Sequence, residues 1–257
     1  MVRSLAVMAL LAPLPALAQE APAVTSLDME TPTQILFVGN SYLYYGDSVH
    51  NHVVRMARAA HPDERFTYKS ATIGGAYLDH HDLDAHLEPG KLGLDDPFDV
   101  VILQGHSTAM TTEAKVARFN VALTEFDAAI RATGAHTALF MTMAYTEDHR
   151  NYDPEMFSKV DAGYTAAGNR VGALVIPVGL AFEMAYERRP GIVLHKSFDG
   201  SHPSLLGTYL IAATMYAALY EPSAVGNPYD YFGAIPADDL AFLQQVAEDA
   251  VAAYYGR

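Results

Sequence analysis

The sequence contains no cysteine. This absence excludes disulfide bonds, thiol nucleophiles and thiolate metal sites together, so the folded chain must rely on its hydrophobic core. Positive charge is scarce as well: 16 Lys and Arg stand against 30 Asp and Glu, which gives a formal net charge of −14 at pH 7. A chain this acidic is a poor partner for nucleic acid or for an anionic membrane surface.

Long apolar runs are lacking beyond the start of the chain. Residues 1–18 combine a positive Arg3 with the run LAVMALLAPLPALA and end in small residues. This pattern is typical of a secretory signal peptide, and the run is too short and too broken by proline to span a bilayer. We therefore expect export to the periplasm or the medium, with no stable membrane insertion. Residues 19–33 predict an N-terminal arm, and residues 34–257 predict a single domain.

Apolar, β-rich runs recur five times, at residues 35–39, 65–73, 99–104, 136–144 and 172–179. Nearly continuous apolar strands of this kind are typically buried on both faces of a sheet. Helical periodicity separates the runs, most clearly in an apolar stripe with steps of three and four residues: Val116, Phe119, Leu123, Phe126 and Ile130.

This alternation of strands and helices predicts an α/β fold, a three-layer α/β/α sandwich around a five-stranded parallel sheet. Two further helices are expected near the end of the chain, at about 203–220 and 236–255. Open sheets of this kind bind ligands at the carboxyl ends of their strands, so polar residues at those ends are candidates for function.

Two serines in the segment GNSYLYYGDSVH could act as a nucleophile. Ser41 follows the first strand directly, where Gly39 and Asn40 tolerate the unusual backbone angles of a sharp turn. Ser48 precedes a helical stretch, and we expect it, or Asp47, to cap that helix through its side-chain oxygen. Ser41 is therefore the candidate nucleophile, although an ordinary turn serine would show the same local pattern.

A serine hydroxyl needs a histidine to accept its proton, and that histidine needs a carboxylate to hold its tautomer. The segment FDGSHPS places Asp199 three residues before His202, and Pro203 suits the first turn of the helix that follows. A carboxylate and an imidazole at this spacing can bond to each other directly at the entrance of a helix. Asp199 and His202 are thus the expected partners of Ser41.

These motifs, in this order, resemble the SGNH (GDSL-like) hydrolase superfamily over essentially the whole chain after residue 18. The resemblance implies a flavodoxin-like fold and hydrolysis of an ester, often an acyl or acetyl group on a sugar or lipid, without a cofactor. It implies Ser41 as nucleophile, His202 as base and Asp199 as its orienting partner. It also assigns the oxyanion hole to the backbone N–H groups of Ser41 and of Gly75, or less favourably Gly74.

The sequence departs from the family in the third motif, where VILQGHSTAM lacks the usual asparagine. Gln104 carries an amide that can donate the same hydrogen bond to an oxyanion, and His106 is a second candidate. The residues expected to contact the substrate, an ester of a saccharide or small molecule, are Asn40, Tyr42, Gly74 and His106. The tyrosines at 42, 44 and 45 are interpreted first as packing residues and second as a platform for a sugar ring or acyl chain.

A histidine-rich stretch supports an alternative chemistry. The segment LDHHDLDAHLE offers ligands for zinc or another divalent cation between His80 and His86, but it lacks a recognised metal-site spacing. A cleft wall next to Gly75 is the favoured interpretation. A metal-dependent hydrolase at this loop and a non-catalytic binding protein on the same fold remain the two alternatives to a serine esterase. The sequence does not indicate an oligomeric state.

Overall fold

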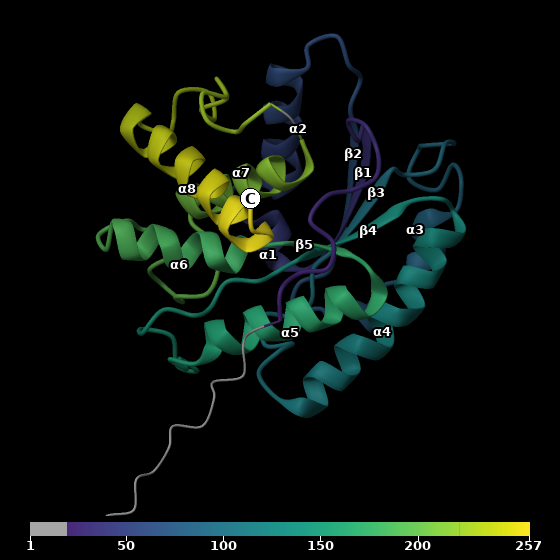
Figure 1. Ribbon diagram of the computed structural model, residues 1–257, viewed down its shortest axis with the longest axis horizontal. Coiled ribbons are helices and arrows are strands. Elements are labelled where there is room, and N and C mark those ends of the chain that lie inside the picture. Colours follow the sequence, from purple (N-terminus) through teal and green to yellow (C-terminus); the bar gives the residue numbers. More distant parts are fainter. Residues whose placement is uncertain (1–19, 221) are drawn as a thin grey trace, which may run out of the picture.

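A computed structural model describes residues 20–220 and 222–257 (Figure 1). The predicted signal peptide, residues 1–18, lies outside the described residues. Five parallel strands form a sheet in the order β2-β1-β3-β4-β5. Their bounds are β1 Gln34–Gly39, β2 Thr67–Thr72, β3 Val100–Leu103, β4 His136–Phe140 and β5 Leu174–Ile176. The predicted sheet is confirmed, because each strand lies within one of the five β-rich runs or overlaps it nearly completely.

The central strands are buried on both faces. Along β1, Ile35 and Phe37 belong to one apolar core while Leu36 and Val38 belong to the other, and all four side chains are fully buried. This follows from the two-residue period of a strand between two layers of helices. Strand β2 differs, since every residue of its sequence TYKSAT is half-buried at the edge of the sheet.

Helices cover the two faces separately, which confirms the three-layer architecture (Figure 1). One layer holds α2 (Val49–Ala60), α6 (Val178–Arg188), α7 (Leu205–Leu219) and α8 (Ala237–Tyr255). The other holds α3 (Leu83–Leu87), α4 (Glu113–Ala132) and α5 (Met156–Val171). The short α1 (Ser41–Tyr44) and the 3-10 turns η1 (Tyr45–Asp47) and η2 (Leu78–His80) lie in loops.

The predicted apolar stripe lies on α4, where Phe119, Leu123, Phe126 and Ile130 are buried and Val116 is partly buried. The other layer has a different pattern. Helix α7 is apolar on all sides, and every residue from 207 to 218 is buried, because it packs against α2, α6 and α8.

The predicted cap at Ser48 is wrong. Ser48 does occupy the N-cap position of α2, but its side chain makes no capping hydrogen bond and its φ is +66°. The preceding turn enforces this conformation, because Asp47 also has a positive φ and Gly46 passes so close to α7 that a Cβ atom there would lie 2.2 Å from Thr208 Oγ1. The tight crossing of η1 over α7 therefore determines the backbone at Ser48.

Helix α7 begins two residues later than expected. Ser204 is its N-cap and accepts a hydrogen bond from the backbone N–H of Gly207 at 3.1 Å, so Pro203 lies before the helix and not in its first turn. The segment from His195 to Pro203 is closed by a bridge between these two residues. Asp199 and His202 thus lie on a short loop that is held at both ends.

The described part of the predicted N-terminal arm runs over the surface of the domain. Asn169 of α5 accepts a hydrogen bond from Ala23 N–H at 2.7 Å and donates one to the carbonyl of Ala21 at 2.9 Å. Among residues 20–220 and 222–257, no helix combines the length and the apolar character that a membrane span requires.

Candidate active site

Polar side chains converge on a cavity of about 410 Å³ at the carboxyl ends of β1, β3 and β4 and beside the loop before α7. Ser41 and His202 both line this cavity. Ser41 is the first residue of α1, directly after the end of β1, so the strand-to-helix turn presents its hydroxyl at the sheet edge. This is the edge at which open α/β sheets bind ligands.

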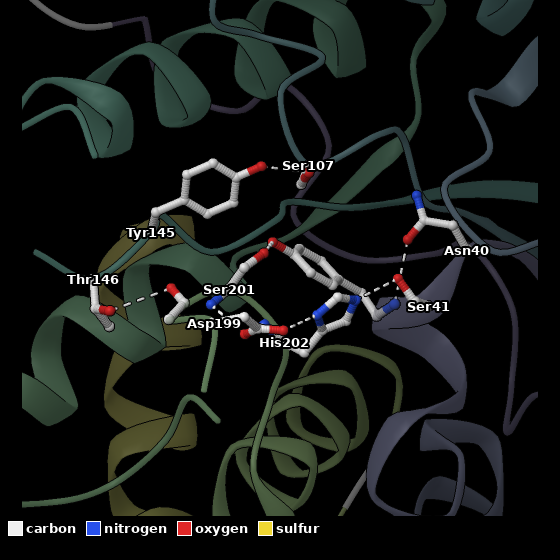
Figure 2. Close-up of polar contacts among 10 residues, drawn as sticks. Asn40, Ser41, Ser107, Tyr145, Thr146, Asp199, Ser201 and His202 are labelled. Carbon is white, nitrogen blue, oxygen red and sulfur yellow. Dashed lines mark hydrogen bonds and ion pairs between the residues drawn. The ribbon is translucent and has the colours of Figure 1, made fainter. Parts of the chain in front are cut away.

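Three predicted residues form one chain of hydrogen bonds (Figure 2). His202 Nδ1 lies 2.5 Å from Asp199 Oδ2, and His202 Nε2 lies 2.8 Å from Ser41 Oγ. Because an ionised carboxylate can only accept hydrogen bonds, Nδ1 carries the ring proton and donates a hydrogen bond to Asp199. Nε2 is then the free base of the neutral ring and accepts a hydrogen bond from the hydroxyl of Ser41. The arrangement matches a nucleophile, a base and an orienting carboxylate.

Asp199 is held by backbone donors as well as by the imidazole. Its Oδ1 accepts hydrogen bonds from the N–H groups of Ser201 at 2.9 Å and of His202 at 3.0 Å. Partial burial raises the pKa of the Asp199 carboxyl, but the hydrogen bonds from the His202 and Ser201 backbone and from the His202 ring lower it more, so its pKa lies below the ordinary value. Asp199 is therefore an ionised acceptor at neutral pH.

Two tyrosines fix the plane of the His202 ring. Tyr45 stacks on it with ring centroids 4.1 Å apart, and Tyr42 packs against it edge-on at 5.7 Å. Tyr42 is buried, and its hydroxyl lies 2.7 Å from Ser201 Oγ. Burial raises the pKa of Tyr42 far above its ordinary value, which keeps this hydroxyl protonated. The geometry supports a packing role for Tyr42 at the floor of the cavity, as the first interpretation of the tyrosine cluster predicts.

The backbone N–H groups of Ser41 and Gly75 have no hydrogen-bond acceptor within the described residues. Gly75 lines the cavity with a φ of +69°, and a Cβ atom there would contact nothing within 4 Å, so its backbone is open to the cavity. Gly74 does not line the cavity, and a Cβ on it would lie 3.2 Å from the hydroxyl of Tyr44. Of the two predicted glycines, Gly75 is thus the one placed to bind an oxyanion.

The prediction that Gln104 donates to the oxyanion needs correction. Gln104 is buried and does not line the cavity, and its Nε2 donates both of its hydrogens inside the protein, to Asn40 Oδ1 at 3.0 Å and to the Gly105 carbonyl at 2.5 Å. Its Oε1 accepts the backbone N–H of Asn40 at 2.9 Å. Gln104 therefore holds the residue next to Ser41 and acts as a positioning residue.

Asn40 connects the three loops around the site. Its Oδ1 accepts from Tyr42 N–H at 3.2 Å in addition to Gln104, and its Nδ2 donates to the carbonyls of Ala76 at 3.1 Å and Gly105 at 3.4 Å. Asn40 was predicted to bind substrate, and it does line the cavity. The oxygen and both hydrogens of its amide nevertheless bond to other protein groups. Its role is therefore to fix the Gly75 turn and the loop after β3 relative to Ser41.

His106 lines the cavity, and its surroundings define its tautomer. Nδ1 accepts the backbone N–H of Thr108 at 3.1 Å, so the ring proton lies on Nε2. Burial and the nearby positive charges of Lys115 and Arg118 lower the pKa of His106, which keeps the ring neutral. The ring stacks on Tyr77 with centroids 4.4 Å apart. His106 thus presents a neutral imidazole with an N–H donor at Nε2, the second candidate for the third motif.

Sequence reasoning missed several residues that line the cavity. Tyr145 follows β4 and its hydroxyl lies 2.7 Å from Ser107 Oγ, while Ser201 precedes His202 in the chain and contacts the Tyr42 hydroxyl (Figure 2). The remaining ones are Tyr77, Thr108, Lys115, His149, Arg150 and Asn151. The signal that could have found Ser107 and Tyr145 is their place just after the third and fourth strands.

The histidine-rich segment does not form a metal site within the described residues, in which no three His, Asp or Glu side chains gather as metal ligands. Several of its polar groups have partners in the protein: Asp79 and His80 contact Arg118, and Asp82 caps α3 by accepting from Ala85 N–H. His81 is buried. The segment is a folded turn, but no residue from 78 to 88 lines the cavity, so the predicted cleft wall is not formed by its side chains.

Comparisons with known proteins show the same fold. No protein-family model matches the sequence, and no curated protein sequence matches it. Among solved structures, a DUF4886 family protein from Bacteroides uniformis superposes with a TM-score of 0.66 at 19% identity, over 85% of this chain and 94% of its own. A candidate SGNH hydrolase from Slackia heliotrinireducens gives 0.59 at 20%, over 74% and 100%. An acetyl xylan esterase gives 0.55 at 15%, over 72% and 99%. The chain has the fold of SGNH hydrolases, as the sequence motifs predict.

Proposed function

We propose that this protein is a serine esterase of the SGNH type that hydrolyses carboxylic esters through an acyl-enzyme on Ser41. The observation that carries the proposal is the continuous chain of hydrogen bonds from Asp199 through His202 to Ser41 Oγ. A turn serine without a catalytic role has no need of a base and an orienting carboxylate at these distances. The hydrolases and esterases among its structural neighbours support the same reaction class.

The first half of the reaction forms the acyl-enzyme. Ser41 Oγ attacks the carbonyl carbon of the ester while its proton passes to His202 Nε2. Negative charge develops on the carbonyl oxygen and, in this proposal, is stabilised by the N–H groups of Ser41 and Gly75, with His106 Nε2–H as the third candidate donor. The tetrahedral intermediate collapses, His202 gives its proton to the departing alkoxide oxygen, and the alcohol leaves.

The second half releases the acid. A water molecule gives a proton to His202 Nε2 and attacks the acyl carbon, and collapse of the second intermediate returns that proton to Ser41 Oγ. Asp199 stays ionised throughout and stabilises the imidazolium each time it forms. No step requires a cofactor.

The cavity favours a short acyl group. Among the described residues, no Val, Leu, Ile or Met lines it, and its walls are made of tyrosine, serine, threonine, histidine, asparagine, glycine and basic side chains. A long fatty acyl chain would find only the tyrosine rings as apolar surface there. We therefore propose an acetyl or similarly short ester of a saccharide or small molecule, and the acetyl xylan esterase among the neighbours fits this class. Export through the predicted signal peptide would place such an enzyme next to extracellular esters.

Covalent labelling with a fluorescent phosphonate tests the proposal directly, since the reagent reacts with activated serines. We expect labelling of the wild type at Ser41, together with hydrolysis of p-nitrophenyl acetate that is faster than hydrolysis of longer p-nitrophenyl esters. A folded protein that neither labels nor hydrolyses any ester would contradict the proposal and would indicate a non-catalytic binding protein on this fold. Labelling with a preference for long acyl chains would contradict only the proposed substrate.

A further inference from the structure

The cavity beside Ser41 has a charge opposite to that of the whole molecule. Lys115 and Arg150 line it, and within the described residues no Asp or Glu side chain does. The chain as a whole has a formal net charge of −14. A positively charged cleft in a negatively charged protein raises the local concentration of an anionic ligand.

Lys115 lies where a helix does not favour a cation. It is the third residue of α4, at the end where the helix dipole is positive, and a lysine there weakens the helix slightly. Among the described residues it has no carboxylate partner; its Nζ donates to Thr108 Oγ1 at 2.8 Å and to Thr111 Oγ1 at 3.5 Å. These hydroxyl contacts leave the positive charge of Lys115 without a counter-charge among the described residues, and such local departures are typical of functional sites.

Arg150 lacks an acidic partner as well. It follows His149 on the loop after β4, is exposed, and makes no hydrogen bond or ion pair within residues 20–220 and 222–257. Arg118, Arg131, Arg188 and Arg189 each bind a carboxylate. Among the described arginines that lack one, Arg150 is the one that lines the cavity. The loop after β4 thus leaves the guanidinium of Arg150 available to a ligand in the cavity.

From these observations we infer that the natural substrate is an anionic ester, one that carries a carboxylate or a comparable fixed negative charge bound by Lys115 and Arg150. The inference rests on the proposed esterase function and specifies its substrate class. Two cations on different segments, one on helix α4 and one on the loop after β4, can bind one anionic group, and a guanidinium matches a carboxylate with two parallel hydrogen bonds. The charge could belong to the acyl or to the alcohol part of the ester, and the substrates below separate these two cases.

Matched ester pairs test the inference. For the alcohol side we would compare 4-acetoxybenzoate with 4-acetoxybenzamide, and for the acyl side mono-p-nitrophenyl glutarate with p-nitrophenyl valerate, each rate divided by its hydroxide-catalysed rate. In the wild type we expect kcat/KM to favour the anionic member of at least one pair by about tenfold or more, the scale of a hydrogen bond to a charged group. Added salt should reduce this preference.

Variants attribute the preference to the two cations. Lys115→Met and Arg150→Met should each lower the anionic-to-neutral ratio of kcat/KM about tenfold, mainly through KM. Lys91→Met removes the same charge from an exposed ion pair with Glu88 outside the cavity, and its ratio should equal that of the wild type.

Equal rates for both members of each pair, or a ratio that Lys115→Met and Arg150→Met leave at the wild-type value, would overturn the inference while leaving the esterase function intact. Absence of both phosphonate labelling and ester hydrolysis would instead contradict the proposed function itself. The two failures are therefore distinguishable.

Discussion

His202 Nε2 lies 2.8 Å from Ser41 Oγ although the two residues are 161 positions apart in the chain. This contact joins the end of the first strand to the loop before α7. It supports Ser41, and not Ser48, as the proposed nucleophile of its segment, because Ser48 lies on the far side of the η1 turn at the start of α2 and does not line the cavity.

We predict that Ser41→Ala leaves the fold intact and lowers kcat by about 10⁴-fold or more, because the other members of such a unit contribute little without the nucleophile. Phosphonate labelling should disappear as well. Ser48→Gly is the matched control: the positive φ at Ser48 favours glycine, so this variant should retain activity and gain up to about 1 kcal/mol in the free energy of unfolding, measured by urea denaturation. Similar losses of activity in the two folded variants would refute the assignment.

His202→Ala should reduce kcat nearly as much as Ser41→Ala, since no other base lies within reach of Ser41 Oγ among the described residues. Asp199→Asn should cost less, as an asparagine oxygen can still accept from His202 Nδ1 but stabilises the imidazolium less. Steady-state kinetics on p-nitrophenyl acetate would measure both. An active His202→Ala protein, with His106 or His195 essential in its place, would contradict the assigned base.

Gln104→Ala should lower stability and kcat together, because it removes three buried hydrogen bonds that fix Asn40 and Gly105. We expect a loss of about 1–3 kcal/mol in the free energy of unfolding. Gln104→Glu should be worse, since it buries a carboxylate beside carbonyl and amide oxygens. Gln245→Ala removes an exposed glutamine bonded to Asp249 and serves as control. A fully stable Gln104→Ala protein with kcat alone reduced would restore the original prediction of a direct oxyanion donor.

Gly75→Ala tests the oxyanion hole through the backbone. A Cβ at this position meets no neighbour, so the change acts through the strained φ of +69° and costs about 1–2 kcal/mol if the turn is maintained. Relaxation of the turn would move the N–H away from the reacting oxygen, and we expect kcat to fall by about 10²-fold with little change in KM. Gly74→Ala, at a φ outside the left-handed region, should lower kcat much less. Equal effects of the two substitutions on kcat would argue against Gly75.

His195 should make stability depend on pH. Burial lowers its pKa to about 4, from about 6.5 in an exposed chain. Between these values the unfolded state binds a proton that the folded state does not, so stability falls as pH decreases from about 6.5 to about 4. His195→Gln should reduce the slope of unfolding free energy against pH in this window by up to roughly 1.4 kcal/mol per pH unit. Urea denaturation between pH 7 and pH 4 would measure it, and an unchanged slope would contradict the buried neutral state.

The sequence predicts the sheet and the layers, because apolar runs and helical periodicity are local in the chain, and it predicts the Asp199–His202 pair because the two residues are three positions apart. The prediction that Ser41 meets this pair across 161 positions rests on its place at a strand end and on the resemblance to SGNH hydrolases. Apolar runs define the strands, and a strand end or a helix entrance defines where a side chain emerges. Partners that come from distant segments escape this reasoning. The direction of the Gln104 amide depends on Asn40, 64 residues away, and the backbone at Ser48 depends on the crossing of η1 over α7. The same holds for Lys115 and Arg150, which approach the cavity from helix α4 and from the loop after β4.

The loop that carries Asp199 and His202 comes after all five strands in the chain. When the ribosome has synthesised all five strands, it has therefore also synthesised Ser41, but His202 and Asp199 are still to be added. Contacts between such distant segments form late, because they require the closure of a long loop of chain. Ester hydrolysis would thus begin only once α7 has docked on the sheet, so a nascent or truncated chain would stay inert toward esters even with its strands in place.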